Sequence, residues 1–260
     1  MNQSGWHHHV RFFELRQVLQ HLSTSGLLDQ EFNLNVLEIG SGSGLILQAL
    51  SRLYPNNCYQ GFDIPSSFFP IDSSFVSLYD GVNIPLPPSS VDVAFSVHTL
   101  EHIDSLDLHF KEISKVLVDG GLYIAVVPTS IWRLLSTLFY YPSAFLIVLN
   151  RLFPRNMVNN SSFSSSKSLS ASTVFPRRHG SHFNILSEHY FFSKFSWTRR
   201  LRKISYNVGL WPLCVFPSNL IYFSHDLFRN FLSLSFRSQL SSLFGSSSII
   251  LIYQKTTFKS

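Results

Sequence analysis

The sequence predicts an α/β fold in which a mostly parallel β-sheet is covered by helices on both faces. Three observations lead to this prediction. Short apolar segments alternate with amphipathic helical segments between residues 10 and 128. One of them, Val91–Val97, is apolar over most of its length, as expected for a strand that is buried on both faces. The chain has 260 residues, of which 45% are hydrophobic, and can therefore form a full hydrophobic core.

Predicted helices and strands follow one another in regular order up to residue 128. Apolar residues recur at helical spacing over residues 10–30, Leu45–Leu53 and Ser105–Val118, so these segments are predicted to be helices. The last helix is expected to end at the glycine stop Asp119-Gly120-Gly121. The predicted strands lie around Val36-Leu37 and at Cys58–Ile64, Phe75–Tyr79, Val91–Val97 and Leu122–Val127. Strands joined by helices in this way form a parallel sheet.

After Pro128 the alternation stops. A very apolar and basic insertion follows, before a sixth strand at Val208–Val215 and a seventh at Ser248–Tyr253. We therefore expect a single domain over residues 1–260, with a core at 33–128, the insertion at 129–200 and the final strands at 201–260.

The insertion contains an uncharged, apolar run, Leu134–Asn150, of 17 residues with Pro142 inside it. A helix that crosses a membrane needs about 20 residues. We therefore expect a pair of helices that is buried in the fold or lies on a bilayer surface, rather than a membrane span.

Charge is distributed unevenly along the chain. Residues 1–119 carry a net charge of −8 and residues 120–260 a net charge of +13, which together give the overall +5. A basic and apolar second half favours contact with a membrane surface or an anionic substrate. A basic face that only keeps an apolar protein in solution is the alternative.

The two cysteines, Cys58 and Cys214, lie in separate apolar contexts, which favours reduced thiols and a reducing compartment. No signal peptide is recognisable at the N-terminus. We expect a cytoplasmic protein that can contact the inner face of a membrane. The triplet His7-His8-His9 could bind a metal ion, but a solvated terminus is the preferred interpretation.

The segment Glu38–Gly44 has the spacing E-x-G-x-G-x-G between a predicted strand and a predicted helix. A glycine turn there lets a ligand lie against bare main chain at a helix N-terminus, where free N–H groups collect. The pattern differs from the G-x-G-x-x-G of dinucleotide-binding enzymes, because Leu45 stands at the third glycine position. Asp63 lies 19 residues after Gly44, at the end of the next predicted strand, where a carboxylate can accept hydrogen bonds from ribose hydroxyls.

Two further motifs follow, residues 78–96 (LYDGVNIPLPPSSVDVAFS) and His98-Thr99-Leu100-Glu101-His102. Together with the glycine turn, their order and spacing resemble the motifs of the class I S-adenosylmethionine (SAM)-dependent methyltransferases, in the small-molecule branch called type 11. The resemblance covers roughly residues 33–128. It implies a Rossmann-like, seven-stranded, mostly parallel sheet and SAM as the cofactor.

The resemblance also implies individual roles. Glu38 would help to seat the methionine ammonium group, Asp63 would bind the ribose, and Ser96 would lie near the reactive end of the cofactor. Ile64 would pack on the adenine ring, whose amine Asp80 would bind. The complete set of implied cofactor residues is Glu38, Gly40, Ser41, Gly42, Gly44, Asp63, Ile64, Asp80, Gly81 and Ser96.

A hydroxyl or enol acceptor benefits from a base, for which histidine is the natural side chain near neutral pH. His98, at the rim where ligands bind in open α/β sheets, is the first candidate, and His102 is expected to pack under the loop. His98 and His102 could bind a metal, but no third ligand is evident, so no metal site is predicted. His179 and His182 are candidates for lining the acceptor pocket, because residues 177–197 resemble methyltransferases of polysaccharide and lipid-linked sugar pathways. In that comparison Ser181 replaces an acidic residue.

The sequence thus predicts methyl transfer from SAM to a small or lipid-linked acceptor, with a sugar hydroxyl favoured. The alternatives are a quinone-like lipophilic ring as acceptor, or an inactive SAM-binding scaffold at a membrane. The basic residues Arg199, Arg200, Arg202 and Lys203 could meet lipid phosphates or form a solvated helix face. No nucleic-acid partner is expected, because no recognition motif is present. The oligomeric state cannot be derived from the sequence.

Overall fold

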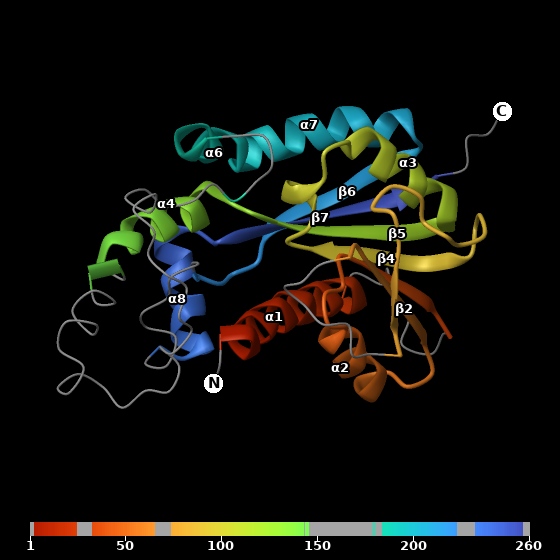
Figure 1. Cartoon of the computed structure of the whole chain (residues 1–260), viewed down its shortest axis with the longest axis horizontal. Helices are drawn as coiled ribbons and strands as arrows, with labels where there is room; N and C mark the ends of the chain where they lie inside the picture. The colour runs from red at the N-terminus through yellow and green to blue at the C-terminus, as the bar shows by residue number, and fades with distance from the viewer. Residues whose placement is uncertain are drawn as a thin grey trace.

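The computed structural model describes residues 3–24, 33–65, 74–142, 144–145, 179, 184–222 and 232–256. Its centre is a seven-stranded sheet with the order β3-β2-β1-β4-β5-β7-β6 (Figure 1). The strands are β1(Asn35–Ile39), β2(Cys58–Asp63), β3(Val76–Leu78), β4(Val91–Val97), β5(Leu117–Pro128), β6(Leu210–Pro217) and β7(Ser248–Lys255). β1 to β5 pair in parallel, whereas β7 is antiparallel to both β5 and β6, so the prediction of a mostly parallel sheet is confirmed.

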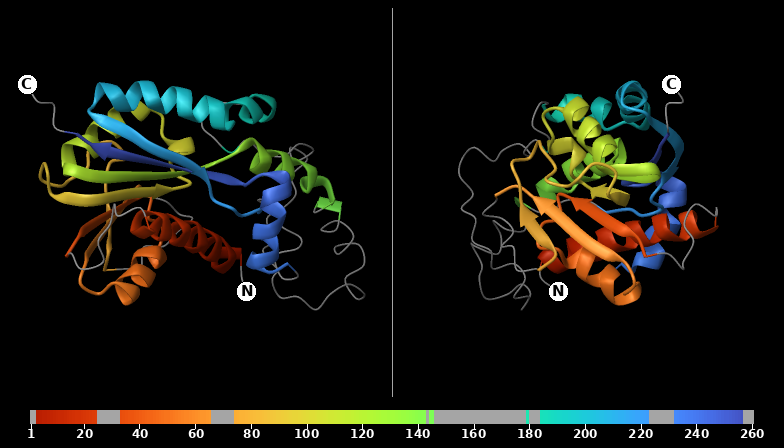
Figure 2. Two further views of the ribbon diagram at one scale, coloured as in Figure 1. Left: turned by 180° about the vertical axis from the view of Figure 1, so that it is seen from behind. Right: turned by 90° about the vertical axis from the view of Figure 1, so that its right-hand side faces the viewer.

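Helices cover both faces of the sheet (Figures 1 and 2). One face carries α1(Gln3–Thr24) and α2(Leu45–Leu53), and the other carries α3(Leu106–Val116), α6(Ile185–Phe191) and α7(Lys194–Asn207). The short turn η1(Leu100–His102) follows β4. At the end of the sheet where β5 stops lie α4(Ser130–Leu138) and α8(Leu234–Phe244), with α8 beside the N-terminal end of α1.

Side chains of the central strands alternate between two apolar layers, as the pleat of a strand requires. On one face Val93, Phe95 and Val97 of β4 pack with apolar residues of α1 and α2. On the other face Ala94 of the same strand belongs to a cluster with residues of α3 and α7. Burial on both faces explains why β4 is apolar over nearly its whole length.

The expected end of the third helix was wrong in one respect. The chain passes from α3 directly into β5 at Leu117, ahead of the predicted glycine stop. Gly120 and Gly121 lie inside β5, where Gly120 has a φ of +80° and the pairing with β4 shifts register between Val91 and Val93. The two glycines therefore permit an irregularity within a strand instead of ending a helix.

The described part of the insertion is anchored by Trp197 of α7, which is fully buried. Its indole Nε1 donates a hydrogen bond to the Pro128 carbonyl at 3.0 Å, and its ring stacks on Phe192 with centroids 6.2 Å apart. The guanidinium of Arg200 lies 4.4 Å from the centre of the same ring. α7 is thus fixed to the end of β5 from which the insertion departs.

The apolar run Leu134–Asn150 falls only partly within the described residues. Its first part forms the end of α4. Among the residues that the structure describes, no helix is both long and apolar enough to cross a membrane.

Replacing Trp197 by Phe should lower the free energy of unfolding by about 2 kcal/mol, because the Pro128 carbonyl loses its indole partner and a cavity opens beside Phe192. Urea unfolding followed by circular dichroism measures the change. Phe195→Leu is a matched control on the same helix, since Phe195 is 62% exposed, and should change stability by less than about 0.5 kcal/mol. Equal effects of both substitutions would contradict the anchoring role of Trp197.

Candidate active site

The predicted site residues gather at the carboxyl ends of β1, β2 and β4. β2 and β3 extend the sheet on one side of β1 and β4 on the other, so the topological switch point lies between β1 and β4. Open α/β sheets bind their ligands in the crevice at such a point. The glycine turn of residues 40–44 begins there and leads into α2.

The glycine turn is held by main-chain hydrogen bonds. The amides of Gly40 and Ser41 both donate to the Phe62 carbonyl, at 2.8 and 3.3 Å. Gly40, Gly42 and Gly44 have φ values of +75°, +57° and +73°, in the left-handed region that favours glycine. A Cβ on Gly40 would also lie 2.3 Å from Thr99 Oγ1 in the loop after β4. Only glycine lets these two loops approach so closely.

Asp63 lies beside this turn, as predicted. Its Oδ2 accepts the Gly42 amide at 2.5 Å, and its Oδ1 accepts the Ile64 amide at 2.7 Å. The carboxylate therefore ties the end of β2 to the glycine turn that follows β1. The binding of ribose by Asp63 stays a prediction that this position favours.

The residues predicted to surround an adenine ring also lie together. Ile64 is 50% exposed, and a Cβ on Gly81 would contact its Cγ2 at 3.0 Å. The exposed Asp80 accepts the amides of Val82 and Asn83 and the Asn83 side chain, and these hydrogen bonds lower its pKa. Its carboxylate thus organises the turn, and any contact with an adenine amine would add to these bonds.

Ser96 occupies a different position from the one predicted for its side chain. The residue pairs with Ile39 at the end of β1, but its side chain is fully buried. Its hydroxyl is 2.9 Å from the Tyr123 hydroxyl, which lies 2.8 Å from His109 Nε2. The side chain points into the core between the sheet and α3, so only the main chain of Ser96 can face the crevice.

Glu38 is the most unusual group of the site. It is 1% exposed, and neither carboxylate oxygen has a hydrogen-bond partner among the described residues. Burial raises its pKa from 4.5 to about 8, although the nearby Arg11 of α1 works in the opposite direction. An unpartnered carboxyl group costs free energy when it is buried. A bound ammonium group would supply the missing partner, so the residues fit the predicted cofactor.

His98 lies at the crevice in a strained conformation, with a φ of +55°. Its Nε2 is 2.5 Å from the Tyr222 hydroxyl and 3.1 Å from Glu14 Oε2, and its Nδ1 is 3.6 Å from Glu101 Oε1. Burial disfavours the charged imidazole, but Glu14 and Glu101 outweigh it and raise the pKa of His98 to about 9. The two carboxylates favour the charged ring, so these surroundings do not support the role of His98 as a base, which stays a prediction.

His179 is brought to the turn after β4, so its predicted place on the acceptor side is compatible with the structure. Its Nε2 lies 3.5 Å from Glu101 Oε1, and its ring contacts the rings of Trp132 and His102 with centroids 4.5 and 4.8 Å apart. His102 is exposed rather than packed under the loop as expected, although partial burial lowers its pKa. His182 lies outside the described residues.

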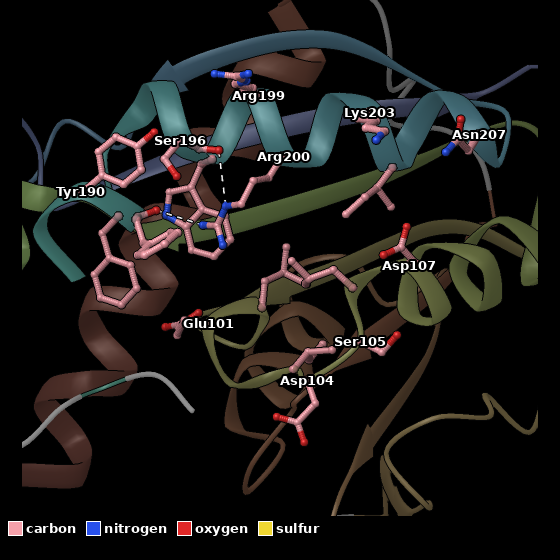
Figure 3. Close-up of a pocket in the computed structure, with 17 residues that line it drawn as sticks. Glu101, Asp104, Ser105, Asp107, Tyr190, Ser196, Arg199, Arg200, Lys203 and Asn207 are labelled. Carbon is pink, nitrogen blue, oxygen red and sulfur yellow. Dashed lines mark hydrogen bonds between the residues drawn. The ribbon is translucent and has the colours of Figure 1, made fainter. Parts of the chain in front are cut away.

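A cavity of about 610 Å³ lies between η1, the start of α3 and α7 (Figure 3). Glu101 lies at the same end of it as Tyr190, whereas Lys203 and Asn207 lie at the other end. Three members of the predicted basic cluster, Arg199, Arg200 and Lys203, line this cavity opposite Asp104 and Asp107. None of the predicted cofactor residues lines it, so it is separate from the crevice at the glycine turn.

Sequence reasoning missed four residues of the rim: Arg11 and Glu14 of α1, Glu101 and Tyr222. One of them left a signal, since Glu14 lies four residues from both Val10 and Val18, on the apolar stripe of its helix. A charged residue at that position indicates a buried polar partner. The other three carry no comparable local pattern.

The chain is similar to known methyltransferases. Residues 37–125 match the type 11 methyltransferase family, described as a methyltransferase domain. A sterol 4-C-methyltransferase, strm-1 of Caenorhabditis elegans, is 26% identical over 113 residues, which are 40% of this chain and 34% of that protein. The match thus spans about a third of the relative's length.

Two solved structures are similar to this chain. A protein of Galdieria sulphuraria, provisionally assigned as a sarcosine dimethylglycine methyltransferase, is similar over 93% of this chain and 84% of its own, with a TM-score of 0.50 and 14% identity. A SAM-dependent methyltransferase of Aquifex aeolicus is similar over 98% of both chains, with a TM-score of 0.49 and 11% identity.

The raised pKa of Glu38 predicts a specific dependence of stability on pH. The folded protein holds this proton more tightly than the unfolded chain does, so the resulting stabilisation is complete below about pH 4.5 and is lost as the pH rises through 8. Glu38→Gln is neutral at every pH. The stability of this variant relative to the parent should therefore rise between pH 6 and 9, by on the order of 2 kcal/mol. Urea unfolding at several pH values measures it, and a difference that does not change with pH would contradict the assignment.

Proposed function

We propose that this chain, whose residues 37–125 match the type 11 methyltransferase family, transfers the methyl group of SAM to a hydroxyl group of a small lipophilic or lipid-linked acceptor. The binding of SAM is supported by the buried Glu38, which has no hydrogen-bond partner among the residues that the structure describes. Glu38 lies beside a glycine turn that Asp63 holds in place.

The cofactor would be held by groups that are already positioned. Glu38 would bind the ammonium group. Asp63 would accept hydrogen bonds from the ribose and would still accept the hydrogen bond from the Gly42 amide. The exposed face of Ile64 next to Gly81 offers an apolar surface to the adenine ring. The main chain of the glycine turn can approach the ligand closely, because it carries no side chain at Gly40, Gly42 and Gly44.

SAM supplies an activated methyl group on a sulfonium centre, so the protein has mainly to align the acceptor and exclude water. Two candidates were predicted as catalytic residues, His98 and His179. His98 would act here as a buried cation that fixes Glu14, Glu101 and Tyr222 relative to one another. His179 remains the candidate that touches the acceptor, because 32% of its side chain is exposed at the rim.

Apolar rings support a lipophilic acceptor. Trp132, Phe192 and His179 form a contiguous aromatic cluster beside η1. The curated relative is named for methylation of a sterol, which is also a lipophilic molecule. A sugar hydroxyl on a lipid carrier and a quinone-like ring both stay within this class. A lipid-linked acceptor would also agree with contact between the basic second half and a membrane surface.

Asp63→Ala should weaken the binding of SAM about 10- to 100-fold, because a charged hydrogen-bond acceptor is lost and the Gly42 amide is released. Gly42→Val should have a similar effect, since its φ of +57° is unfavourable for a β-branched residue. Isothermal titration calorimetry with SAM measures both.

Asp92→Asn is the matched control. Asp92 Oδ2 accepts the Asn35 amide at 2.8 Å, at the opposite end of β1 from the glycine turn. This variant should change stability but not the dissociation constant of SAM. If Asp63→Ala bound SAM like the parent protein, the proposed position of the cofactor would be wrong.

The acceptor class predicts where a transferred methyl group will be found. With methyl-labelled SAM and separate lipid and aqueous cell extracts, label should enter the organic phase only when lipid extract is present. Label that stays in water-soluble products would contradict a lipophilic acceptor and favour a free sugar. If SAM binds but neither extract supports release of S-adenosylhomocysteine, an inactive scaffold becomes the better reading.

A further inference from the structure

We propose that Glu101, His102 and His179 bind one divalent transition-metal ion of the zinc type. One ligand atom from each of the three residues lies within 4.8 Å of the other two. Two neutral imidazoles and a carboxylate are a ligand set that zinc uses in proteins, with a fourth position left open. The site is independent of the proposed function, because binding of the ion requires neither SAM nor an acceptor.

The geometry of Glu101 indicates a ligand that the described residues do not supply. Its side chain is 0% exposed, and neither oxygen has a hydrogen-bond partner within the described part of the chain. The nearest groups are His179 Nε2 at 3.5 Å and His98 Nδ1 at 3.6 Å from Oε1, which are ion-pair distances rather than good hydrogen bonds. Ligand atoms on a tetrahedral zinc ion are about 3.4 Å apart, given bond lengths near 2.1 Å. The distance of 3.5 Å between His179 Nε2 and Glu101 Oε1 is close to this value.

Supporting contacts hold the ligands in place. The His179 amide donates to Glu188 Oε1 at 2.6 Å, and Glu188 Oε2 lies 2.8 Å from Arg133 Nε. The His179 ring rests against Trp132. On the other side, His98 faces the Glu101 carboxylate and is itself fixed by Glu14 and Tyr222. Groups behind the ligands that orient them are a regular feature of metal sites.

Glu101 and His102 are adjacent in sequence, and both lie in the single turn η1. The His102 amide donates to the Thr99 carbonyl at 2.9 Å, which fixes the main chain of the turn. The His102 side chain is exposed, so it can rotate toward a metal ion without displacing core residues. Glu101 also lines the 610 Å³ cavity of Figure 3, on the edge nearest Tyr190. The proposed ion would therefore lie between that cavity and the cofactor crevice.

Zinc uptake by the purified full chain tests the proposal. Because His7-His8-His9 could bind zinc as well, the parent protein for this experiment carries Gln at these three positions. After equilibrium dialysis against micromolar Zn²⁺, mass spectrometry of the metal content should give one ion per chain. Zinc should also raise the melting temperature, since an ion that binds only the folded state stabilises it. Mg²⁺ at the same concentration should do neither, because imidazole ligands favour zinc.

His102→Ala and His179→Ala should each weaken zinc binding at least ~100-fold, more than the loss of a group behind the ligands would. His189→Ala is the control, because His189 lies on α6 outside the cluster. It should leave the stoichiometry and the affinity unchanged. The exposed position of His102 makes loss of folding in His102→Ala unexpected, and circular dichroism checks it. No zinc in the parent, or equal zinc in parent and His102→Ala, would overturn the proposal.

Discussion

The hydrogen bond from the Gly42 amide to Asp63 is the contact on which the site depends. It joins the turn after β1 to the end of β2, so that two strands and one helix present their polar groups to the same crevice. The two amides that bind the Phe62 carbonyl reinforce this junction from the other side of the turn. Because a main-chain N–H is tied to a carboxylate, the glycine turn is fixed before any ligand arrives. A fixed turn lowers the ordering cost of binding.

Three buried carboxyl groups, those of Glu14, Glu38 and Glu101, lie in different electrostatic environments. Glu14 and Glu101 lie on either side of His98. His179 and His98 together keep the pKa of Glu101 below its usual range despite burial. For Glu38 burial outweighs the opposite effect of Arg11, so the pKa of Glu38 rises to about 8. Glu14 is thus a carboxylate that His98 and Tyr222 already satisfy, whereas Glu38 is poised for a ligand. A bound cation at Glu38 would favour its ionised form, and binding would then release a proton.

Features that depend on neighbouring residues could be predicted from the sequence. The glycine turn and the position of Asp63 follow from strand–turn–helix order, and the structure contains both. The grouping of Ile64 with Gly81 was implied only by the family resemblance, and the two residues do lie close together. Contacts between distant segments could not be predicted in the same way. The Tyr222 hydroxyl meets Glu14 across 208 positions and His98 across 124, and no local pattern encodes either contact. The same holds for the charge of His98, which Glu14 of α1, 84 positions away, favours together with Glu101.

A buried ion pair in the insertion positions His179. Arg133 of α4 and Glu188 of α6 form an ion pair with both side chains almost fully buried. Such a pair stabilises the fold only weakly in total, but loss of either partner leaves an uncompensated buried charge. Glu188 also accepts the His179 amide, so the pair sets where His179 lies relative to Glu101. The position of His179 is therefore set by two residues that do not line the 610 Å³ cavity. Relatives with the same cofactor crevice could change their acceptor by changing this support, while the glycine turn and Asp63 stay as they are.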